Sequence, residues 1–485
     1  MSLNHFSFTQ DPELDRSLQK VLFTSIPGTF FFVVIQGSAY TAFVRALSKK
    51  DSLYGFLAAL PLIAGVFRFL SAFLIEKFRR RREVFLFALY AQRLSWIPFA
   101  LTPYLIPPTE PRLRIALAVL CLSLHGAGGA MGDVAFISWL TDLVPAEIRG
   151  SYLGRRNRLG QVTAMITPIA VGWCLDRHPG FAGLSTVLIT AAIFGVADIS
   201  IWHWVKHPPM KENPRTLSFE GMFLKPLRLP SYRKLLFFWA AALFAFGLVG
   251  PFCMVYALEV LGFSYTQASM QLQVLPGVMA FLLSGLLGRS IDEYGSKPLL
   301  RLCMSVSITL PIFWIASTPR FPWPQLAANL LGGATWIGLD MAQMSLMMKI
   351  LPNENRSVYI AGYGLTAWLL GNATGSMFGG FLADRLRPLV EAHGIRFLGA
   401  PLTVYQVMFF LSFLLRFVVL TLVLPGIEEP EAKSAREVLA FLRRKKRADR
   451  AGSSLRATAA ENTAGEITPE RLPASVTPVR IKEKG

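Results

Sequence analysis

The chain has 485 residues, of which 53% are hydrophobic and only 16% charged, and its mean hydropathy is +0.44. Soluble domains carry roughly 25% charged residues, and a single soluble core stops growing at about 250 to 300 residues. This composition excludes an ordinary soluble protein and predicts one that crosses a membrane many times. The net charge of +19 leaves nucleic-acid binding open until the basic residues are located.

Twelve apolar segments are long enough to cross the hydrocarbon core as helices, which takes about 20 residues each. Helices are expected because isolated strands would leave backbone groups unpaired in lipid, and these segments lack the alternation of a barrel strand. In chain order the predicted spans are residues 21–45, 53–76, 84–106, 115–141, 157–176, 182–206, 234–260, 267–289, 297–317, 323–349, 356–383 and 402–425.

The predicted organisation is therefore an all-α membrane protein in five parts. Its parts are an N-terminus (1–20), a six-helix bundle (21–206), a central loop (207–233), a second six-helix bundle (234–425) and a basic, largely disordered tail (426–485).

The basic residues indicate the orientation of the chain. With the N-terminus inside, 36 of the 49 Lys and Arg residues lie in or next to the cytoplasmic segments. The positive-inside rule then predicts that both termini lie in the cytoplasm. The membrane is expected to be the inner cell membrane. Charges spread over one membrane face need no nucleic acid to explain them, and anionic lipid at the cytoplasmic face is the expected partner.

Sites for chemistry are scarce in this sequence. The four cysteines, Cys121, Cys174, Cys253 and Cys303, lie within apolar runs and show no CxxC spacing. There is no Walker motif, and no nucleophile-base pair is evident. We therefore expect no metal, no cofactor and no enzymatic activity.

An internal repeat joins the two halves of the chain. The segment that begins at Asp133, DVAFISWLTDLVPAEIRGSYL, matches the segment that begins at Asp340, DMAQMSLMMKILPNENRSVYI, at seven positions with a constant offset of 207. A second match pairs GWCLDR (172–177) with GGFLADR (379–385). The two six-helix segments are therefore expected to be copies of one unit.

The loop between the eighth and ninth spans carries a further motif. Gly288, Asp292, Gly295 and Lys297 spell G-x-x-x-D-x-x-G-x-K. With twelve spans in a 6 + 6 arrangement and a long central loop, this motif resembles the major facilitator superfamily over residues 21–425, and TDLVPAEIRGSYLGRRN resembles its bacterial sugar-transport-like members. The first-half loop departs from the motif, with Ala72, Glu76 and Arg79 at the corresponding positions.

The candidate cavity residues are polar or aromatic side chains near the membrane midplane. The resemblance implies that spans 1, 4, 7 and 10 line a central cavity, and charges inside a bilayer are functional candidates by default. The candidates are Gln36, Tyr40, Asp133, Tyr256, Trp336, Asp340 and Gln343. Either aspartate could bind a proton, or both could be structural.

The other charges within spans have alternative roles. Arg68 and Arg93 could face an anionic substrate or neutralise Asp133, and we favour neutralisation. Asp198 and Arg416 are expected to be structural.

The candidate cytoplasmic gate consists of charged and glycine residues beside helix ends, where opposite charges such as Glu76 and Arg81 can pair. In the superfamily such loop contacts hold the inner side closed. The gate residues are Glu76, Arg81, Asp142, Arg149, Gly288, Asp292, Gly295, Lys297 and Arg356.

The expected function is secondary transport of a small polar organic solute, with a sugar favoured, by a permease that exposes one cavity alternately to each side. The hypotheses kept beside it are proton coupling, proton antiport of drugs or metabolites, and a non-transporting assembly or sensor protein. A monomer is expected.

Overall fold

The computed structural model describes residues 8–210, 227–351 and 356–427. The predicted tail therefore lies almost wholly outside the described residues, as do much of the central loop and the side chain of Arg356. The described chain is helical apart from one short hairpin, β1 (Arg396–Phe397) and β2 (Ala400–Pro401), whose antiparallel register pairs Phe397 with Ala400.

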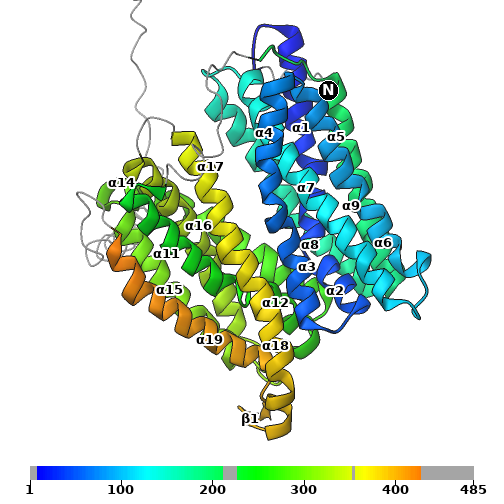
Figure 1. Ribbon diagram of the computed structural model, residues 1–485, viewed down its shortest axis with the longest axis vertical. Helices are drawn as coiled ribbons and strands as arrows, with labels where there is room; N and C mark the ends of the chain where they lie inside the picture. The colour runs from blue at the N-terminus through cyan, green and yellow to red at the C-terminus, as the bar shows by residue number, and fades with distance from the viewer. Residues whose placement is uncertain (1–7, 211–226, 352–355, 428–485) are drawn as a thin grey trace, which may run out of the picture. The chain divides into compact units, whose positions relative to one another are not determined.

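Twelve helical rods follow one another along the described residues, and several rods consist of two or three helical pieces (Figure 1). The pieces are α1 (Pro12–Ile35), α2 (Ser38–Leu47), α3 (Asp51–Ile63), η2 (Ala64–Val66), α4 (Phe67–Phe78), α5 (Arg81–Leu94), α6 (Trp96–Leu105), α7 (Pro111–Leu143), α8 (Arg149–Arg177), α9 (Phe181–Ile201), η3 (Trp202–Trp204), α11 (Pro230–Gly247), α12 (Gly250–Val255), η4 (Tyr256–Val260), α13 (Tyr265–Ser269), η5 (Met270–Val274), α14 (Leu275–Tyr294), α15 (Ser296–Ala316), α16 (Pro324–Ile350), α17 (Arg356–Ala367), η6 (Trp368–Ala373), α18 (Thr374–His393), α19 (Val404–Val418), η7 (Val419–Val423) and η8 (Leu424–Gly426).

Nine of these rods, counted over the described residues, are long and apolar enough to cross a membrane. The other three correspond to the predicted spans 5, 10 and 11. Arginines at the start of α8 and amides with Asp340 in α16 make two of these helices more polar, but α8 has 29 residues and α16 has 27, enough to span the hydrocarbon. The first rod begins at Pro12, earlier than predicted, because Asp11 caps it by accepting hydrogen bonds from the amides of Glu13 and Leu14.

Successive rods run in opposite directions, so their ends gather on two sides. We call the side on which α1 begins the N side and the opposite side the far side. On the N side the Tyr152 hydroxyl donates to the Leu18 carbonyl at 2.9 Å, and Lys206 pairs with Asp11 and Glu13. The far side holds the turns that follow α2, α6, α8 and α18.

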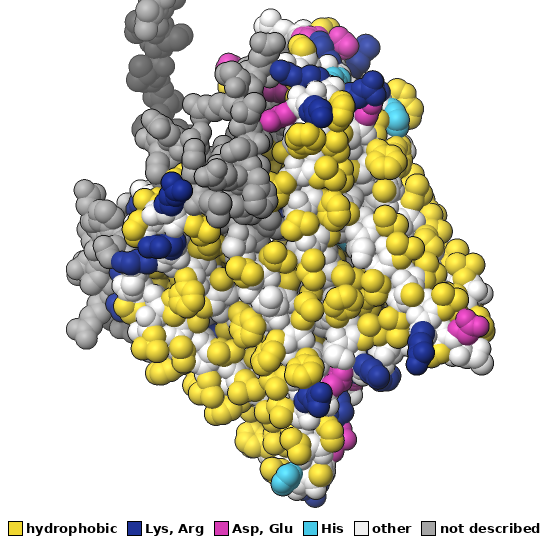
Figure 2. All heavy atoms as spheres, in the orientation of Figure 1, with side chains coloured by type: hydrophobic (Ala, Val, Ile, Leu, Met, Phe, Trp, Pro, Cys, Tyr) yellow, Lys and Arg dark blue, Asp and Glu magenta, His cyan; other side chains and the backbone are white. Residues whose placement is uncertain are grey.

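Apolar side chains cover the lipid-facing surface of the helices. Figure 2 shows hydrophobic residues over the middle of the helices on the visible face, with charged side chains gathered near the helix ends. Phe87, Leu282 and Leu422 are among the most exposed, at 77%, 64% and 75%. Exposed apolar side chains on helices whose backbone bonds are satisfied internally are typical of a chain surrounded by lipid.

The first rod is broken at its centre, and the break positions cavity residues. Helix α1 ends at Ile35 and α2 begins at Ser38, so Gln36 and Gly37 form the junction. A Cβ on Gly37 would lie 3.0 Å from the side-chain nitrogen of Gln273 on the second half of the chain. The missing side chain at Gly37 therefore allows the two halves to approach at this level.

Three glycines on the eleventh rod allow it to pack against α11. A Cβ added to Gly371, Gly375 or Gly379 would lie 2.3 to 2.6 Å from a backbone carbonyl oxygen of α11 or of the residue that follows it. No side chain fits at such distances, so the glycines set the separation of these two helices, as small residues do in membrane helix pairs.

Replacing Gly375 by alanine is expected to lower the thermal unfolding midpoint of the protein in detergent. The new Cβ would lie 2.5 Å from the Phe244 carbonyl oxygen, and overpacking of this kind costs about 1 to 3 kcal/mol. Gly285→Ala is the matched control, because a Cβ there meets nothing within 4 Å. Equal midpoints for the two variants would contradict the close packing described here.

Candidate functional site

A cavity of about 640 Å³ lies between helices from both halves of the chain. This volume suits a small organic molecule, since ligand pockets typically measure about 300 to 1,000 Å³. Its lining combines amides with aromatic rings. The amides are Gln36, Gln273, Asn329 and Asn372, and the large aromatic residues are Tyr40, Tyr54, Trp96, Phe246, Trp314, Trp336, Trp368 and Phe409.

The polar lining residues are held by neighbours behind them. The Trp96 indole donates to Nδ1 of His125 at 2.9 Å, which fixes both rings at the wall. Asn329 donates to the side-chain oxygen of Gln325, and Gln325 in turn contacts Gln271. These amides are oriented before any solute enters, which lowers the entropy cost of binding.

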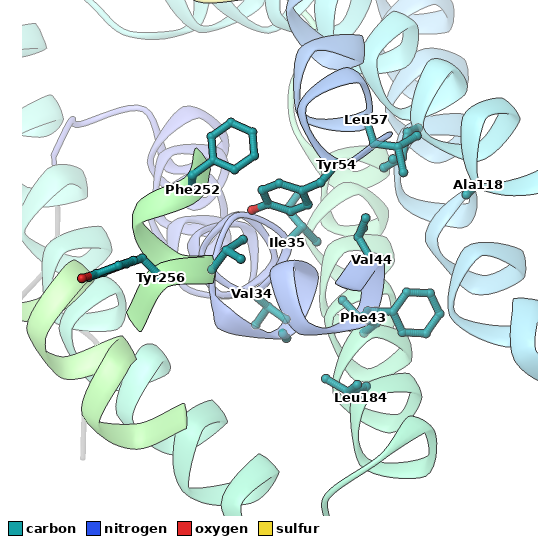
Figure 3. Close-up of a cluster of buried hydrophobic side chains, with 14 of the residues drawn as sticks. Val34, Ile35, Phe43, Val44, Tyr54, Leu57, Ala118, Leu184, Phe252 and Tyr256 are labelled. Carbon is teal, nitrogen blue, oxygen red and sulfur yellow. The ribbon is translucent and has the colours of Figure 1, made fainter. Parts of the chain in front are cut away.

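Of the seven predicted cavity residues, three line this cavity: Gln36, Tyr40 and Trp336. Tyr256 does not, because it is fully buried and donates to the Ser317 carbonyl at 2.6 Å. In Figure 3 its hydroxyl points away from Tyr54, which belongs to the same buried cluster and does line the cavity.

The predicted acidic residues lie outside the cavity lining. Asp133 pairs with Arg68 at 3.3 Å, and both side chains are about half exposed. Asp340 is exposed on α16, and Gln343 is partly buried one turn further on. Of the three residues on this predicted face of α16, Trp336 lines the cavity, whereas Asp340 and Gln343, about one and two turns further along the helix, do not.

Arg93 pairs with Asp198 rather than with Asp133. The ion pair measures 3.3 Å and is almost completely buried between α5 and α9. Arg93 also donates to the Gln92 side chain. The expectation that arginines neutralise Asp133 therefore applies to Arg68 alone.

A network of charges, the far-side cluster, joins the two halves around the buried carboxylate of Asp51. It consists of Arg45, Lys49, Asp51, Glu259, Arg387 and Tyr405. Asp51 is fully buried and accepts from Arg45 at 2.8 Å, from the Tyr405 hydroxyl at 2.8 Å and from Arg387. Glu259 accepts from Arg45 at 2.8 Å and from Lys49 at 2.9 Å. Lys49, a basic residue that the positive-inside rule would disfavour on this side, is thus neutralised by an acid of the other half.

Two helix N-termini on the far side are capped by aspartates of the opposite half. Asp176 on α8 accepts from the amides of Tyr265 and Thr266 at 2.7 and 3.0 Å, at the start of α13. Asp384 on α18 accepts from the amides of Asp51 and Ser52, both at 2.9 Å, at the start of α3. A carboxylate at a helix N-terminus satisfies free N–H groups and the helix dipole. We call these contacts the reciprocal caps.

On the N side, Arg81 occupies the centre of the first-half loop contacts. Its fully buried side chain pairs with Asp142 and donates to the carbonyl and hydroxyl oxygens of Ser138 at 3.1 and 3.2 Å. The expected pairing of Arg81 with Glu76 is wrong, because Glu76 is exposed and the guanidinium turns inward toward α7. In the second half Ser296 donates to Ser345, the repeat partner of Ser138, at 2.6 Å.

The remaining gate candidates have varied positions. Arg149 donates to the carbonyls of Thr141 and Val144 at 3.0 and 3.2 Å. Gly295 has φ +93°, which favours glycine at the sharp turn between α14 and α15, and Gly288 lies next to Met341. Asp292 is exposed, Lys297 lies in the first turn of α15, and the side chain of Arg356 lies outside the described residues.

Two ionisable side chains near these N-side contacts, Lys206 and His207, have shifted pKa values. Hydrogen bonds to Glu13 and Asp11 raise the pKa of Lys206. Burial lowers the pKa of His207, and the positive charges of Arg81 and Arg82 act in the same direction. His207 therefore favours its neutral form at the end of the first half.

Several functional residues have no distinctive sequence signal. The sequence predicted no cavity residue on the rods that carry Gln273 and Asn372, and Asn329 lies on α16 about two turns before Trp336. The far-side cluster combines loop charges with residues at the ends of predicted spans, such as Arg45 and Glu259, and no sequence pattern indicated how they pair. Only the match of GWCLDR with GGFLADR pointed to Asp176 and Asp384, and it did not show what they bind.

Within the described ranges, no group of three or more His, Cys, Asp or Glu residues is placed to hold a metal ion.

Three solved structures that are similar in fold are distant in sequence. A mutant form of the nucleoside transporter NupG superposes with a TM-score of 0.65 at 12% identity, covering 85% of this chain and 100% of that one. A bacterial homolog of the human lysosomal transporter Spinster gives 0.61 at 16%, covering 86% and 97%. The xylose transporter XylE from E. coli gives 0.60 at 17%, covering 88% and 99%. At these identities the likeness shows the fold alone.

Among curated proteins, no sequence matches the chain. A family model, described as Major Facilitator Superfamily, matches residues 22–376. That match covers well over half of the chain, and the family consists of transporters rather than enzymes. The protein is thus a multi-pass membrane protein and a secondary transporter of small solutes, and it belongs to the Major Facilitator Superfamily.

Proposed function

We propose that the protein carries a small polar organic solute, with a sugar-like molecule favoured, through the cavity between its two halves. The observation that carries this proposal is the lining itself, where amides from both halves face several aromatic rings. Amides exchange hydrogen bonds with hydroxyl groups, and aromatic faces pack against the apolar face of a sugar ring. Two of the fold neighbours are named for xylose, which is consistent with this class.

A drug or metabolite antiporter is the second candidate. Apolar residues such as Leu310, Met254 and Phe409 also line the cavity and would suit a more hydrophobic cargo. The two candidates differ in direction, because a sugar permease accumulates its solute and an antiporter expels its cargo when protons enter.

Uptake into proteoliposomes tests the proposal. With a panel of labelled sugars and polyols, Gln36→Ala should lower uptake of the transported compound about tenfold, since a lost hydrogen bond to solute costs roughly 1.4 kcal/mol. Gln161→Ala is the control, because that amide is exposed on α8 and does not line the cavity. Absence of flux for every sugar and polyol would contradict the proposal of a sugar-like solute.

The proposed orientation puts the N side in the cytoplasm and the protein in the inner cell membrane as a monomer. The excess of Lys and Arg in the N-side segments supports it, and those charges also suit anionic lipid as a partner. The far-side cluster and the reciprocal caps then close the outer side, and they must break for the cavity to open outward.

Asp340 is the proposed site of a coupling proton. It lies within α16 and has no ion pair within the part of the chain that is described, whereas Asp133 is paired with Arg68. Asp340→Asn should lose pH-driven accumulation and keep solute exchange across the vesicle membrane. Asp133→Asn, the matched control, should lower thermal stability without altering the pH profile of transport. Unchanged accumulation in Asp340→Asn would exclude this residue.

Asp51→Asn should open the outer side more often. Removing a shared buried carboxylate costs about 3 to 5 kcal/mol, because Arg45 and Arg387 lose a common partner. The readout is the alkylation rate of Cys253, which lines the cavity, by a membrane-impermeant maleimide in intact cells whose transporter lacks the other three cysteines.

Glu391→Gln is the matched control for this measurement. Glu391 is an exposed partner of Arg387 on the same helix, at 3.8 Å, so its loss leaves the contacts between the halves intact. Alkylation should be faster in Asp51→Asn than in the wild type and unchanged in Glu391→Gln. An unchanged rate in Asp51→Asn would contradict the role of the far-side cluster in closure.

A further inference from the structure

Four arginines are buried in the part of the chain that the structure describes: Arg45, Arg81, Arg93 and Arg416. The first three each have a carboxylate partner, Asp51 with Glu259, Asp142 and Asp198 respectively. Arg416 has none among the described residues, although its side chain is only 6% exposed. A buried guanidinium without a counter-charge is strongly disfavoured, so its presence calls for an explanation.

The surroundings of Arg416 place it at the cavity wall. It lines the cavity from α19, together with Phe409 about two turns earlier on the same helix. Its guanidinium lies 4.6 Å from the ring centre of Phe246, and that ring packs against Trp336 at 4.8 Å. Both aromatic residues line the same cavity, so the positive charge borders the part of the wall where a solute ring would stack.

The remaining lining supplies no negative charge. None of the described residues that line the cavity is an aspartate or a glutamate, and Arg416 is the one arginine or lysine among them. His125 is engaged by the Trp96 indole through Nδ1, which requires that nitrogen to be unprotonated. The cavity therefore carries a net positive charge next to neutral hydrogen-bonding groups.

A structural role uses only part of the hydrogen-bonding capacity of the Arg416 side chain. Arg416 donates to the Ser307 carbonyl at 2.7 Å. Pro311, four residues later in α15, has no N–H for that carbonyl, so the arginine replaces a missing helix hydrogen bond. One neutral N–H donor would satisfy the oxygen, whereas arginine brings five donors and a charge, and its Nε has no partner.

Different contacts join the corresponding rods of the two halves. Arg93 and Asp198 lie on the third and sixth rods of the first half, α5 and α9. Ser307 and Arg416 lie on the third and sixth rods of the second half, α15 and α19. The first half closes its charge pair internally, and the second half leaves its arginine facing the cavity without an acid.

We propose that the transported solute is a hydroxylated organic anion whose carboxylate or phosphate group binds Arg416, beside the Phe246 and Trp336 rings. This inference rests on the proposed function of the cavity and names the charge of its solute. An arginine recognises either anion through charge-assisted hydrogen bonds, which are about twice as strong as neutral ones.

The test compares matched pairs of compounds on the purified full-length transporter in detergent. D-glucuronate is paired with D-glucose and D-galacturonate with D-galactose, and D-glucose 6-phosphate provides the phosphate arm. Binding is followed by tryptophan fluorescence, since Trp336 lines the cavity, and by the shift of the thermal midpoint. At least one anion should bind the wild type about tenfold or more tightly than its neutral partner.

Three variants separate charge from structure. Arg416→Gln keeps an N–H donor for the Ser307 carbonyl and should abolish the preference for the anion. Arg416→Lys keeps the charge and should retain part of that preference. Arg385→Gln removes an exposed arginine outside the cavity and should bind like the wild type. The thermal midpoint of each variant without ligand shows whether it is folded.

The outcomes distinguish this inference from the proposed function. Neutral sugars that bind the wild type and Arg416→Gln equally well, with no preference for anions, would overturn the inference and leave the proposed function standing. Binding of no compound in either class would count against both. A preference for the carboxylates over the phosphate ester, or the reverse, identifies the anionic group.

Discussion

The contact on which the arrangement of the helices most depends is the one that surrounds Asp51. This carboxylate is fully buried where the two halves of the chain meet, and it is shared by one arginine from each half. In an apolar surrounding the charges of Asp51 and Arg45 would each be costly alone, so they can be buried only as a pair, with the partly exposed Arg387 as a further partner. Asp51 also begins α3, whose amide is capped by Asp384, and this couples the charge cluster to the position of a helix that borders the cavity.

The buried arginines fall into two groups, according to whether each has an acidic partner. Every buried arginine described outside the cavity has an acid beside it, which makes those residues part of the scaffold. The one that borders the cavity has none, and its charge is available to a solute. The transported anion then does not have to bind tightly. The Arg416 guanidinium already contacts the Phe246 ring and the Ser307 carbonyl, so we expect it to bind an anion with moderate affinity. Moderate affinity favours release on the other side of the membrane.

The sequence predicted the helical fold because apolar length and the positions of basic residues are dictated by the bilayer itself. It also predicted that Gln36, Tyr40 and Trp336 border a cavity. It failed for Tyr256, since a tyrosine on a lining helix can equally point into the core. The partners of Arg81 and Arg93 could not be predicted, because they lie about 60 and 105 positions away and depend on helix rotation. Periodicity gives the faces of a helix and does not say which neighbour each face meets.

The reciprocal caps show how the two halves of the chain are related to each other. Asp176 and Asp384 occupy matching segments of the internal repeat, and each binds the first turn of a helix in the other half. A contact made twice, with the partners exchanged, is the mark of an isologous interface between two identical subunits related by a twofold axis. The caps therefore relate the two halves of this single chain as an isologous interface relates two subunits, because each half gives and receives the same contact. The pairing of Arg93 with Asp198 in the first half, and of Arg416 with the Ser307 carbonyl in the second, departs from that symmetry.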